Sequence, residues 1–370
     1  MNVWRSMLAD PNLRFPARPA FAEDLHVVAM PEGVGFLIVG EETPVAMRGR
    51  HAAVAVEYLR NSMDGTRSVD DLVAACPPGL PGETLLKTLS LLHAKGLLRG
   101  PRRPQPTAVD STLRRQLLFW GRHVGPTRGA HSADSVQARL DGASIVLIGT
   151  GLFGTVVFDL LTRSGCRDIH LVGWDDDGFL GEAVAVSPVP PAEYVPLDTT
   201  STVRATELVR RWGATADLMV SATLNGPDSL SFGLNDAAVA AGSPWLRSNL
   251  VAAELEVGPL VRPGESACYT CARLREAAAR GLAPEQFWYE QEMSRERPAG
   301  ETPPRGESLA TASVAASLVV AEAVRCLAGI APPTLINAVQ SVALLTGVSR
   351  IDRVLRVPRC PACATGAVRR

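Results

Sequence analysis

Before residue 100 the hydrophobic positions form two kinds of pattern. Three short apolar runs come first, and they predict a small antiparallel sheet: Leu25 to Met30, Val34 to Val39 and Pro44 to Met47. Three stretches with helical spacing follow, over Gly49 to Asn61, from Ser68 onward, and over Glu83 to Lys95. Asp71, three residues after Ser68, completes an N-terminal capping pattern, and Gly96 ends the last stretch. Three strands followed by three helices indicate a winged-helix-like α+β domain.

A second pattern begins at residue 144. The apolar run Ser144 to Ile148 is followed by glycines at 149, 151 and 154 and then by helical spacing as far as Gly165. A second buried strand, Ile169 to Val172, ends in an acidic cluster that contains Asp175 and Asp177. Strand, glycine turn, helix, strand and acid form the dinucleotide-type βαβ fingerprint, in which Gly149, Gly151 and Gly154 let a phosphate approach a helix N-terminus. The context makes this a strong signal of fold and a weaker signal of nucleotide binding.

The remaining apolar segments extend the same sheet. Ala216 to Ala222 and Trp245 to Leu250 predict further buried strands, and helices over Leu230 to Gly242 and Ser308 to Leu327 would cover its faces. We therefore expect an α/β, Rossmann-type fold with a mainly parallel sheet.

Two Pro-rich stretches mark breaks in the chain. Gly100 to Pro106 predicts a linker, which precedes a polar helix at Ser111 to His123, and Arg297 to Glu307 predicts an exposed loop. The expected organisation is an N-terminal domain over residues 1–100, a linker and connecting helix over 101–140, and a larger domain over 141–370.

Composition narrows the function classes. Of 370 residues 46% are hydrophobic and 20% charged, which is ordinary for a globular protein, and the formal net charge of −1 argues against nucleic-acid or anionic-lipid binding. Residues 1–19 lack the apolar core of a signal peptide, and the apolar run from Ser308 to Ala321 is too short to span a bilayer. We expect a cytoplasmic location and no membrane partner.

The cysteines carry the most specific chemistry. Four of the seven form two CxxC pairs, Cys268 with Cys271 and Cys360 with Cys363. Two such pairs supply four thiolates at the spacing of a structural zinc site, which leaves no position open for substrate. Disulfides or unligated thiols are the alternative, and a cytosolic protein disfavours disulfides.

These motifs together resemble one family. A glycine-turn βαβ unit, a CxxC pair, a long helix and a C-terminal CxxC pair are similar to the ThiF-like adenylating proteins, over about Leu113 to Ala364. The phrase RVLRVPRCPAC, from Arg353 to Cys363, resembles the ThiF-like partners of YcaO cyclodehydratases, which help to make azoline- and azole-containing ribosomal peptides. The N-terminal domain is similar to PqqD-like peptide-recognition elements. The resemblance implies a precursor peptide and a YcaO-type cyclodehydratase as partners, and it leaves a homodimer open.

Active ThiF-like proteins use four groups around ATP, and the resemblance implies where each should stand. They are an acid after the second strand, an Asn-x-x-Arg-Gln segment beyond it, a phosphate-binding Lys, and a magnesium-binding Asp after a later strand. Asp175 or Asp177 fits the acid, whereas the segment Phe179 to Pro188 contains neither Arg nor Gln.

The other two groups are missing as well. The chain has no lysine after Lys95, and Leu224-Asn225 stands where Asp-Asn is expected, with Asp228 displaced by several residues. Adenylyl transfer depends on positioning and charge neutralisation, so the loss of these groups removes the reaction. We expect no catalytic residues and weak or no ATP binding. An enzyme that adenylates a peptide carboxylate is the alternative, and Arg247 is a candidate substitute cation.

The N-terminal domain is expected to capture the peptide by strand addition, in which backbone hydrogen bonds give affinity and side-chain pockets give selectivity. The predicted groove lies between the third strand and the third helix. Its candidate residues are Val45, Met47, Arg48, Leu86, Lys87, Leu89 and Lys95. The leucines could instead form the domain's own core. A DNA-binding regulator is the third function class, and the sparse cations of the third helix disfavour it.

Overall fold

The computed structural model describes residues 16–21, 25–31, 34–39, 44–100, 111–124, 133–174, 179–185, 187, 189–197, 202–280, 288, 292 and 306–364. The chain divides into two compact units, and the main boundary lies between Gln137 and Ala138. The first comprises residues 1–137 with 329–331, and the second comprises residues 138–328 with 332–370.

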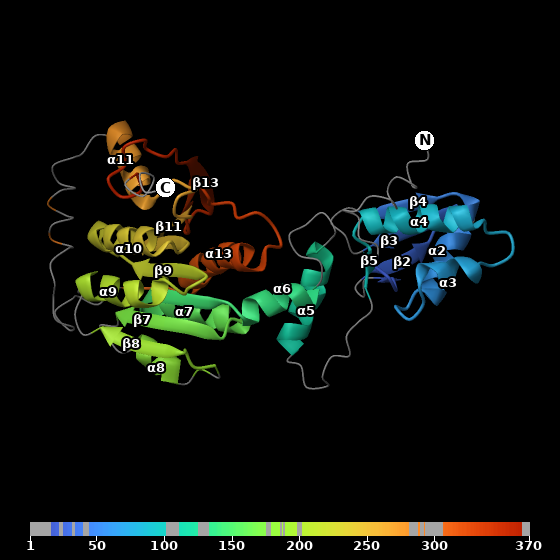
Figure 1. Cartoon of the computed structure of the whole chain (residues 1–370), viewed down its shortest axis with the longest axis horizontal. Helices are drawn as coiled ribbons and strands as arrows, with labels where there is room; N and C mark the ends of the chain where they lie inside the picture. Colours follow the sequence, from blue (N-terminus) through green and yellow to red (C-terminus); the bar gives the residue numbers. More distant parts are fainter. Residues whose placement is uncertain are drawn as a thin grey trace. The chain divides into compact units, whose positions relative to one another are not determined.

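The first unit contains the three strands and three helices that the hydrophobic pattern predicts, in the predicted order (Figure 1). Its antiparallel sheet has the order β2-β3-β4, with β2 at His26–Ala29, β3 at Gly35–Val39 and β4 at Val45–Arg48. The helices are α2 at Arg50–Ser62, α3 at Val69–Ala74 and α4 at Gly82–Ala94. A short pair, β1 at Ala20–Phe21 with β5 at Leu98–Arg99, and helix α5 at Ser111–His123 also belong to this unit.

Local sequence explains where these helices begin and end. The side chain of Ser68 accepts a hydrogen bond from the Asp71 N–H, while the Asp71 carboxylate accepts one from the Ser68 N–H, so the predicted capping pattern is present at α3. Gly96 has a positive φ of 72°, which suits glycine and ends α4. The leucines of α4 at 85, 89 and 92 are fully buried and pack the unit's core together with Ile38 of β3.

The second unit is built on an eight-stranded sheet with the order β13-β12-β11-β10-β9-β6-β7-β8. The strands from β10 to β8 are parallel, and β11 to β13 run antiparallel, so the expected mainly parallel sheet is confirmed. The bounds are β6 Ser144–Thr150, β7 Asp168–Trp174, β8 Glu193–Leu197, β9 Leu218–Leu224, β10 Trp245–Val251, β11 Glu254–Val261, β12 Ala338–Ala343 and β13 Val348–Arg353.

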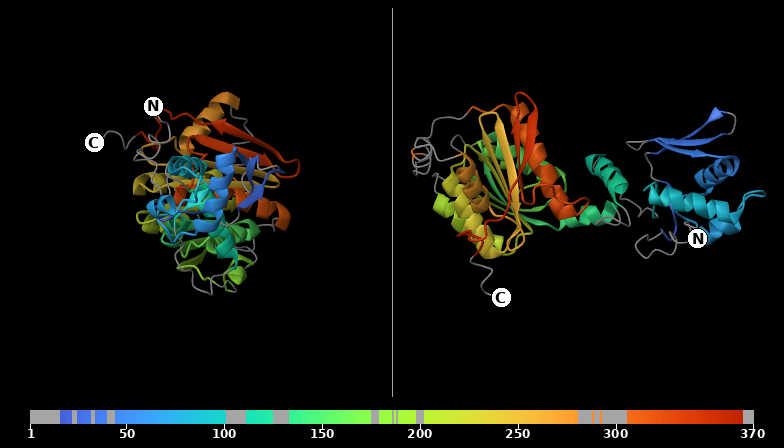
Figure 2. Two further views of the ribbon diagram at one scale, coloured as in Figure 1. Left: turned by 90° about the vertical axis from the view of Figure 1, so that its right-hand side faces the viewer. Right: turned by 90° about the horizontal axis from the view of Figure 1, so that it is seen from above.

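Helices cover both faces of this sheet (Figure 2). One face carries α7 at Gly151–Arg163, α8 at Phe179–Ala185 and α13 at Leu309–Ala328. The other carries α9 at Thr202–Gly213, α10 at Asp228–Ala241 and α11 at Tyr269–Arg280. Helix α6 at Ala133–Asp141 leads into β6. Sheet residues such as Val146 and Met219 pack with α9 and α10 in one continuous buried cluster.

The strand order creates a switch point at β6. The chain leaves β6 through α7 to β7 on one side, whereas β9, reached after α9, pairs with β6 on the other side. In open α/β sheets the crevice beyond the carboxyl ends of strands at such a point is the usual ligand position. The loops after β6 and β9 are therefore the first place to look for a site.

Helix α13 is the one described helix that is long and apolar enough to cross a membrane, so the expectation that this apolar segment is too short to span a bilayer is wrong as a statement of length. It packs against α7 and against strands β9 to β11, as the core helix of an α/β sheet does. Its one buried acid, Glu322, accepts hydrogen bonds from the Leu335 N–H at 2.7 Å and the Thr334 hydroxyl at 3.0 Å, and it pairs with Arg325. Those partners offset the cost of burying the carboxylate.

Candidate metal centre and nucleotide-site remnant

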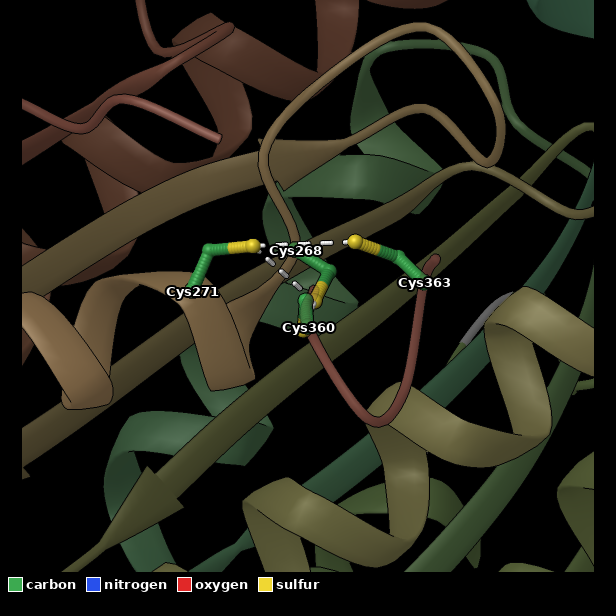
Figure 3. A group of neighbouring side chains, drawn as sticks. All are labelled: Cys268, Cys271, Cys360 and Cys363. Atoms are coloured by element: carbon green, nitrogen blue, oxygen red, sulfur yellow. Dashed lines mark hydrogen bonds between the residues drawn. The ribbon is translucent and has the colours of Figure 1, made fainter. Parts of the chain in front are cut away.

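The two CxxC pairs meet in space although 92 residues separate their corresponding cysteines. Cys268 precedes α11 and Cys271 lies in its first turn, while Cys360 and Cys363 occupy a turn that follows β13. All four sulfur atoms lie within 4.8 Å of one another and all four residues are buried (Figure 3). The pairing of the two CxxC segments predicted from sequence is therefore confirmed.

The distances between sulfur atoms fit a tetrahedral metal ion. The Sγ atoms of Cys268 and Cys271 are 3.8 Å apart, and those of the pairs Cys268–Cys360 and Cys271–Cys363 are 3.6 Å apart. A tetrahedron with metal–sulfur bonds of about 2.3 Å has edges of about 3.8 Å. A disulfide needs sulfur atoms about 2.05 Å apart, so the arrangement suits a metal and not a pair of disulfides.

Burial and nearby backbone N–H groups around the four thiols also favour a bound metal ion. Burial raises the pKa of the Cys268 thiol, so this group favours the neutral form until a cation is bound. Burial is the largest influence on the pKa of Cys360 and acts to raise it, but hydrogen bonds from the backbone N–H groups of Cys363 and Ala362, together with those to the Cys271 and Cys268 thiols, lower this pKa below its ordinary value. The N–H of Val357 points at the sulfur of Cys271, 3.3 Å away. Such N–H contacts are how outer groups stabilise thiolate ligands.

The other three cysteines do not join this cluster. Cys166 is buried in the core, where burial raises its pKa to about 12. Cys76 and Cys326 are half-buried, and burial raises the pKa of each. These residues therefore behave as small apolar side chains.

The glycine turn after β6 is held by close backbone packing. A Cβ atom on Gly154 would lie 2.7 Å from the Cα of Gly149, so the start of α7 can approach β6 only because both residues are glycine. Gly151 has a positive φ of 55°. The three glycines therefore shape the turn predicted from sequence.

An internal carboxylate lies on this turn. The Leu152 N–H, in the first turn of α7, donates a hydrogen bond of 2.5 Å to Oε2 of Glu307. A Cβ atom on Gly151 would lie 2.9 Å from both carboxylate oxygens, so the carboxylate sits directly against the glycine. A helix N-terminus favours an anion because its N–H groups point outward and its dipole is positive there. Glu307 supplies that anion from the segment that precedes α13.

Asn225 follows β9, and a side-chain amide from β10 holds the loop that Asn225 begins. The Asn249 side chain ties the loop by accepting from the Gly226 N–H at 2.9 Å and from the Thr223 hydroxyl at 3.0 Å. Leu224 is nearly buried, and its N–H donates to the Thr150 hydroxyl. The acids Asp175 and Asp177 lie outside the described residues.

Asp228 and Arg247, the other candidates for the missing groups, belong to one ionic network. Asp228 accepts a hydrogen bond of 2.6 Å from the Tyr269 hydroxyl and pairs with Arg273. The buried guanidinium of Arg247 lies 4.8 Å from the centre of the Tyr269 ring and donates to Glu256 at 3.0 Å. Both side chains thus join α10, α11 and β10 and contact the start of the helix that carries Cys271.

The candidate peptide-groove residues of the first unit differ in exposure. Met47 and Leu89 are buried in that unit's own core, because they belong to the apolar faces of β4 and α4 that pack together with Ile38. Val45 and Leu86 are half-buried, and Arg48, Lys87 and Lys95 are exposed. Lys87 pairs with Glu83 one turn earlier, at 3.1 Å.

Glu307 is the residue that sequence reasoning missed. It falls at the end of the Pro-rich stretch and shares no motif with the glycines, which lie more than 150 residues earlier in the chain. The one available signal was an acid just before the helix predicted at Ser308 to Leu327, and acids are common before helices. The ionic network around Tyr269 had no sequence signal beyond the isolated Arg247.

The order of strands, the glycine turn at the switch point and the buried four-cysteine cluster together define an α/β protein with a mainly parallel sheet and a candidate metal centre. No protein-family model and no curated protein sequence matches the chain. Solved structures do match. The chain is similar to Escherichia coli MccB with the peptide MccA-N7isoASN, at 16% identity over 94% of this chain and 99% of that chain, with a TM-score of 0.67. For the microcin C7 biosynthetic enzyme MccB in complex with N-formylated MccA, the identity is 18% and the TM-score 0.66, over 93% and 99% of the two chains. It is also similar to the heterocyclase TruD, at 17% identity and a TM-score of 0.59, over 94% of this chain and 43% of that chain.

Proposed function

We propose that this protein binds the leader of a ribosomally synthesised precursor peptide and presents the core of that peptide to a YcaO-type cyclodehydratase. In this proposal the ThiF-like fold serves as a scaffold and does not adenylate. The carboxylate of Glu307 on the glycine turn carries the argument, because a nucleotide phosphate would need the same helix N-terminus. A second negative charge there would face Glu307, and the sequence supplies no lysine beyond Lys95 to neutralise it.

The comparison with TruD concerns the catalytic part of the proposal. The chain corresponds to 43% of that heterocyclase, so more than half of the heterocyclase chain has no counterpart here. We propose that a YcaO-type cyclodehydratase performs the part of heterocyclisation that the matched region does not. The MccB structures contain the peptide MccA, which supports a precursor peptide as the other partner.

We assign peptide capture to the first unit, as a winged-helix, PqqD-like recognition element. Strand β4 is an edge of its sheet, so an extended leader could add to it by backbone hydrogen bonds. Val45 and Leu86 are then the apolar contacts, since both are half-buried, and Arg48, Lys87 and Lys95 supply positive charge for an acidic leader. Met47 and Leu89 support the groove from the core side.

The four-cysteine cluster completes the proposal as a structural zinc site in a cytoplasmic protein. Four thiolates fill a tetrahedral ion's coordination sphere, so no position remains for substrate or water. Buried thiols that stay reduced suit a cytoplasmic location.

Adenylation of a peptide carboxylate is the second candidate function. It is favoured by the length of the match with MccB, whose structures include complexes with ATP and with AMPCPP and the MccA peptide. The two proposals differ in one measurable reaction. A scaffold gives no ATP–pyrophosphate exchange with any precursor peptide, whereas an adenylating enzyme gives exchange that depends on the peptide.

The test of peptide capture is a titration of a fluorescein-labelled leader into the full-length protein, with and without ATP. We expect Leu86→Ala to weaken binding about tenfold or more, which is the range for an apolar anchor. Leu91→Ala provides a matched control, because Leu91 lies on α4 but is exposed on another side of the helix. Equal leader affinities for both variants and the unmodified protein would contradict the groove assignment. Peptide-dependent ATP–pyrophosphate exchange would contradict the scaffold role and favour the adenylating enzyme.

A further inference from the structure

An open groove lies between helices α10 and α11 of the second unit, beside the cysteine cluster. Its volume is about 640 Å³, within the size range of binding pockets in proteins. Helix α10 supplies one wall, α11 supplies Thr270, and the turn between Cys360 and Cys363 supplies Pro361 and Ala362. In Figure 3 this turn projects away from the sulfur atoms. No cluster cysteine and no residue of the glycine turn lines the groove, so it is distinct from both.

The wall on α10 is the side of that helix that faces away from the sheet. Its side chains recur at helical spacing, and they are Phe232, Asp236, Val239 and Ala240. Phe232 and Val239 are half-buried, and Ala240 is exposed. On α11, Leu274 lies one turn beyond the residue that lines the groove and is 43% exposed, so it extends the apolar surface on that side. A concave, mostly apolar surface of this kind is typical of a site that a partner covers.

Contacts on both sides hold the groove in shape. The buried amide of Asn235 accepts a hydrogen bond from the Tyr269 N–H at 2.9 Å and donates one to the Thr270 hydroxyl at 3.2 Å. These bonds fix α10 to the start of α11. The cysteine cluster fixes the opposite wall to the same helix, because Cys271 lies in the first turn of α11. A groove that is formed before binding loses little conformational entropy when a partner enters it.

Asp236 is the one charged residue among those that line the groove. Its side chain is exposed and forms no ion pair with any described residue, and the Asn235 amide donates to it over a long 3.4 Å. Apolar walls with one available negative charge suit a segment that carries a large apolar side chain next to an arginine or lysine. They disfavour an acidic peptide, a nucleic acid or an anionic lipid surface, because each would place negative charge beside Asp236.

We propose that the cyclodehydratase partner docks in this groove through an apolar and basic segment of its surface. This inference rests on the function proposed above and adds the surface that the second partner uses. The acidic leader is assigned to the first unit, where Arg48, Lys87 and Lys95 supply positive charge, so charge directs the two partners to different surfaces. The apolar side chain of the enzyme fills the space beside Phe232, and the neighbouring cation pairs with Asp236.

The test is biolayer interferometry between the full-length protein and a YcaO-type cyclodehydratase from the same organism. Ala240→Arg fills the groove and repels a cation, so we expect the Kd to rise about tenfold or more, and Asp236→Arg should act similarly. Asp236→Asn removes only the attraction. It should raise the Kd about two- to fivefold at low salt and less at high salt, because salt screens an exposed pair. All three variants change exposed positions, so zinc content and melting temperature should stay unchanged.

Two variants on the other face of the sheet are matched controls. Ala185→Arg and Glu182→Arg make the corresponding changes at exposed positions of α8. Neither should change the Kd for the cyclodehydratase by more than about twofold, as is usual for surface substitutions away from an interface. None of the five variants should change the affinity for the labelled leader, which the first unit binds.

Three results would overturn the proposal, and they differ in what else they contradict. If the cyclodehydratase binds the unmodified protein and all variants equally, it docks elsewhere and the proposed function stands. If the groove variants weaken leader binding as much as enzyme binding, the groove holds the peptide. If the unmodified protein does not bind the cyclodehydratase, the proposed function fails together with this inference.

Discussion

The cysteine cluster and the glycine turn lie in the same unit, and residue spacing predicts both. They differ in how many of the groups needed to bind a ligand are present. At the cluster every group that binds a tetrahedral metal is present, with sulfur atoms 3.6 to 3.8 Å apart among the pairs in contact. At the turn the backbone is complete, with Gly154 packed on Gly149. There the backbone N–H of Leu152 donates a hydrogen bond to the carboxylate of Glu307, a residue of the same chain.

The difference shows what each kind of motif reports. A motif of ligand side chains reports chemistry directly, because cysteine thiolates have few other reasons to converge in the core. A motif of glycines reports close backbone approach, and that approach serves helix–strand packing whether or not a nucleotide binds. Packing alone can explain the turn in this protein, whereas packing does not explain the cluster.

The largest effect is expected at the cysteine cluster. Cys360→Ser removes one thiolate from a closed site, so the ion and its contribution to folding should both be lost. We expect zinc to fall from about one ion per chain to a small fraction, with a loss of at least ~4 kcal/mol in unfolding free energy, as for other metal losses. Elemental analysis and urea unfolding measure the two quantities.

Cys326→Ser is the matched control for this variant. Cys326 is a half-buried cysteine of the same unit that lies outside the cluster, so its loss should leave zinc content unchanged. A purified protein without zinc, whose four cluster cysteines are reduced and which is as stable as the zinc-loaded form, would contradict the assignment.

A smaller effect is expected from the packing of the glycine turn. Gly154→Ala would place a Cβ atom 2.7 Å from the Cα of Gly149, so α7 must move away from β6. We expect a loss of about 1–3 kcal/mol in unfolding free energy, the usual cost of overpacking a core. Gly181→Ala is the control, because a Cβ on Gly181 meets its nearest atom at an ordinary 3.5 Å. Equal stability of the two variants would show that the turn is not tightly packed.

Much of the fold was accessible from sequence because each strand and helix has its own local signal. The expected strand Ser144 to Ile148 is β6, and the expected helix Ser308 to Leu327 is α13 within one residue at each end. The capping pattern at Ser68 gave the start of α3. The cysteine cluster could be predicted from the sequence because two CxxC pairs complete a four-thiolate metal site only if the two segments lie side by side.

The rest depends on contacts between distant segments. Every residue of strand β13 is exposed, and its two apolar residues, Val348 and Ile351, do not alternate with the polar ones, so the sequence does not predict a strand there; the pairing with β12 defines it. Glu307 was not predicted because its role depends on a backbone N–H of α7, which has no sequence signature. Leu89 was assigned to both the core and the groove, since helical spacing shows that a face is apolar but not which neighbour covers it.

The smallest effect on stability, and the sharpest test of the comparison, is expected at Glu307. Glu307→Ala removes the carboxylate from the helix N-terminus, which should cost about 1 kcal/mol in unfolding free energy. Glu307→Gln should cost less, since it keeps the shape and removes only the charge. Glu265→Ala, at an exposed glutamate of the same unit, should change stability little.

The same variants separate an absent nucleotide site from a covered one. If Glu307 merely covers a working phosphate site, its removal should create affinity for ATP in a titration calorimeter. We expect no such gain, because the chain has no lysine beyond Lys95 to place beside a phosphate at the N-terminus of α7, and the candidate substitute Arg247 is already paired with Glu256. Neutralisation of charge is what nucleotide sites of this kind depend on. Micromolar ATP binding by Glu307→Ala would show instead that the turn can still bind a nucleotide phosphate. The turn would then differ from the cysteine cluster only because Glu307 occupies its binding position.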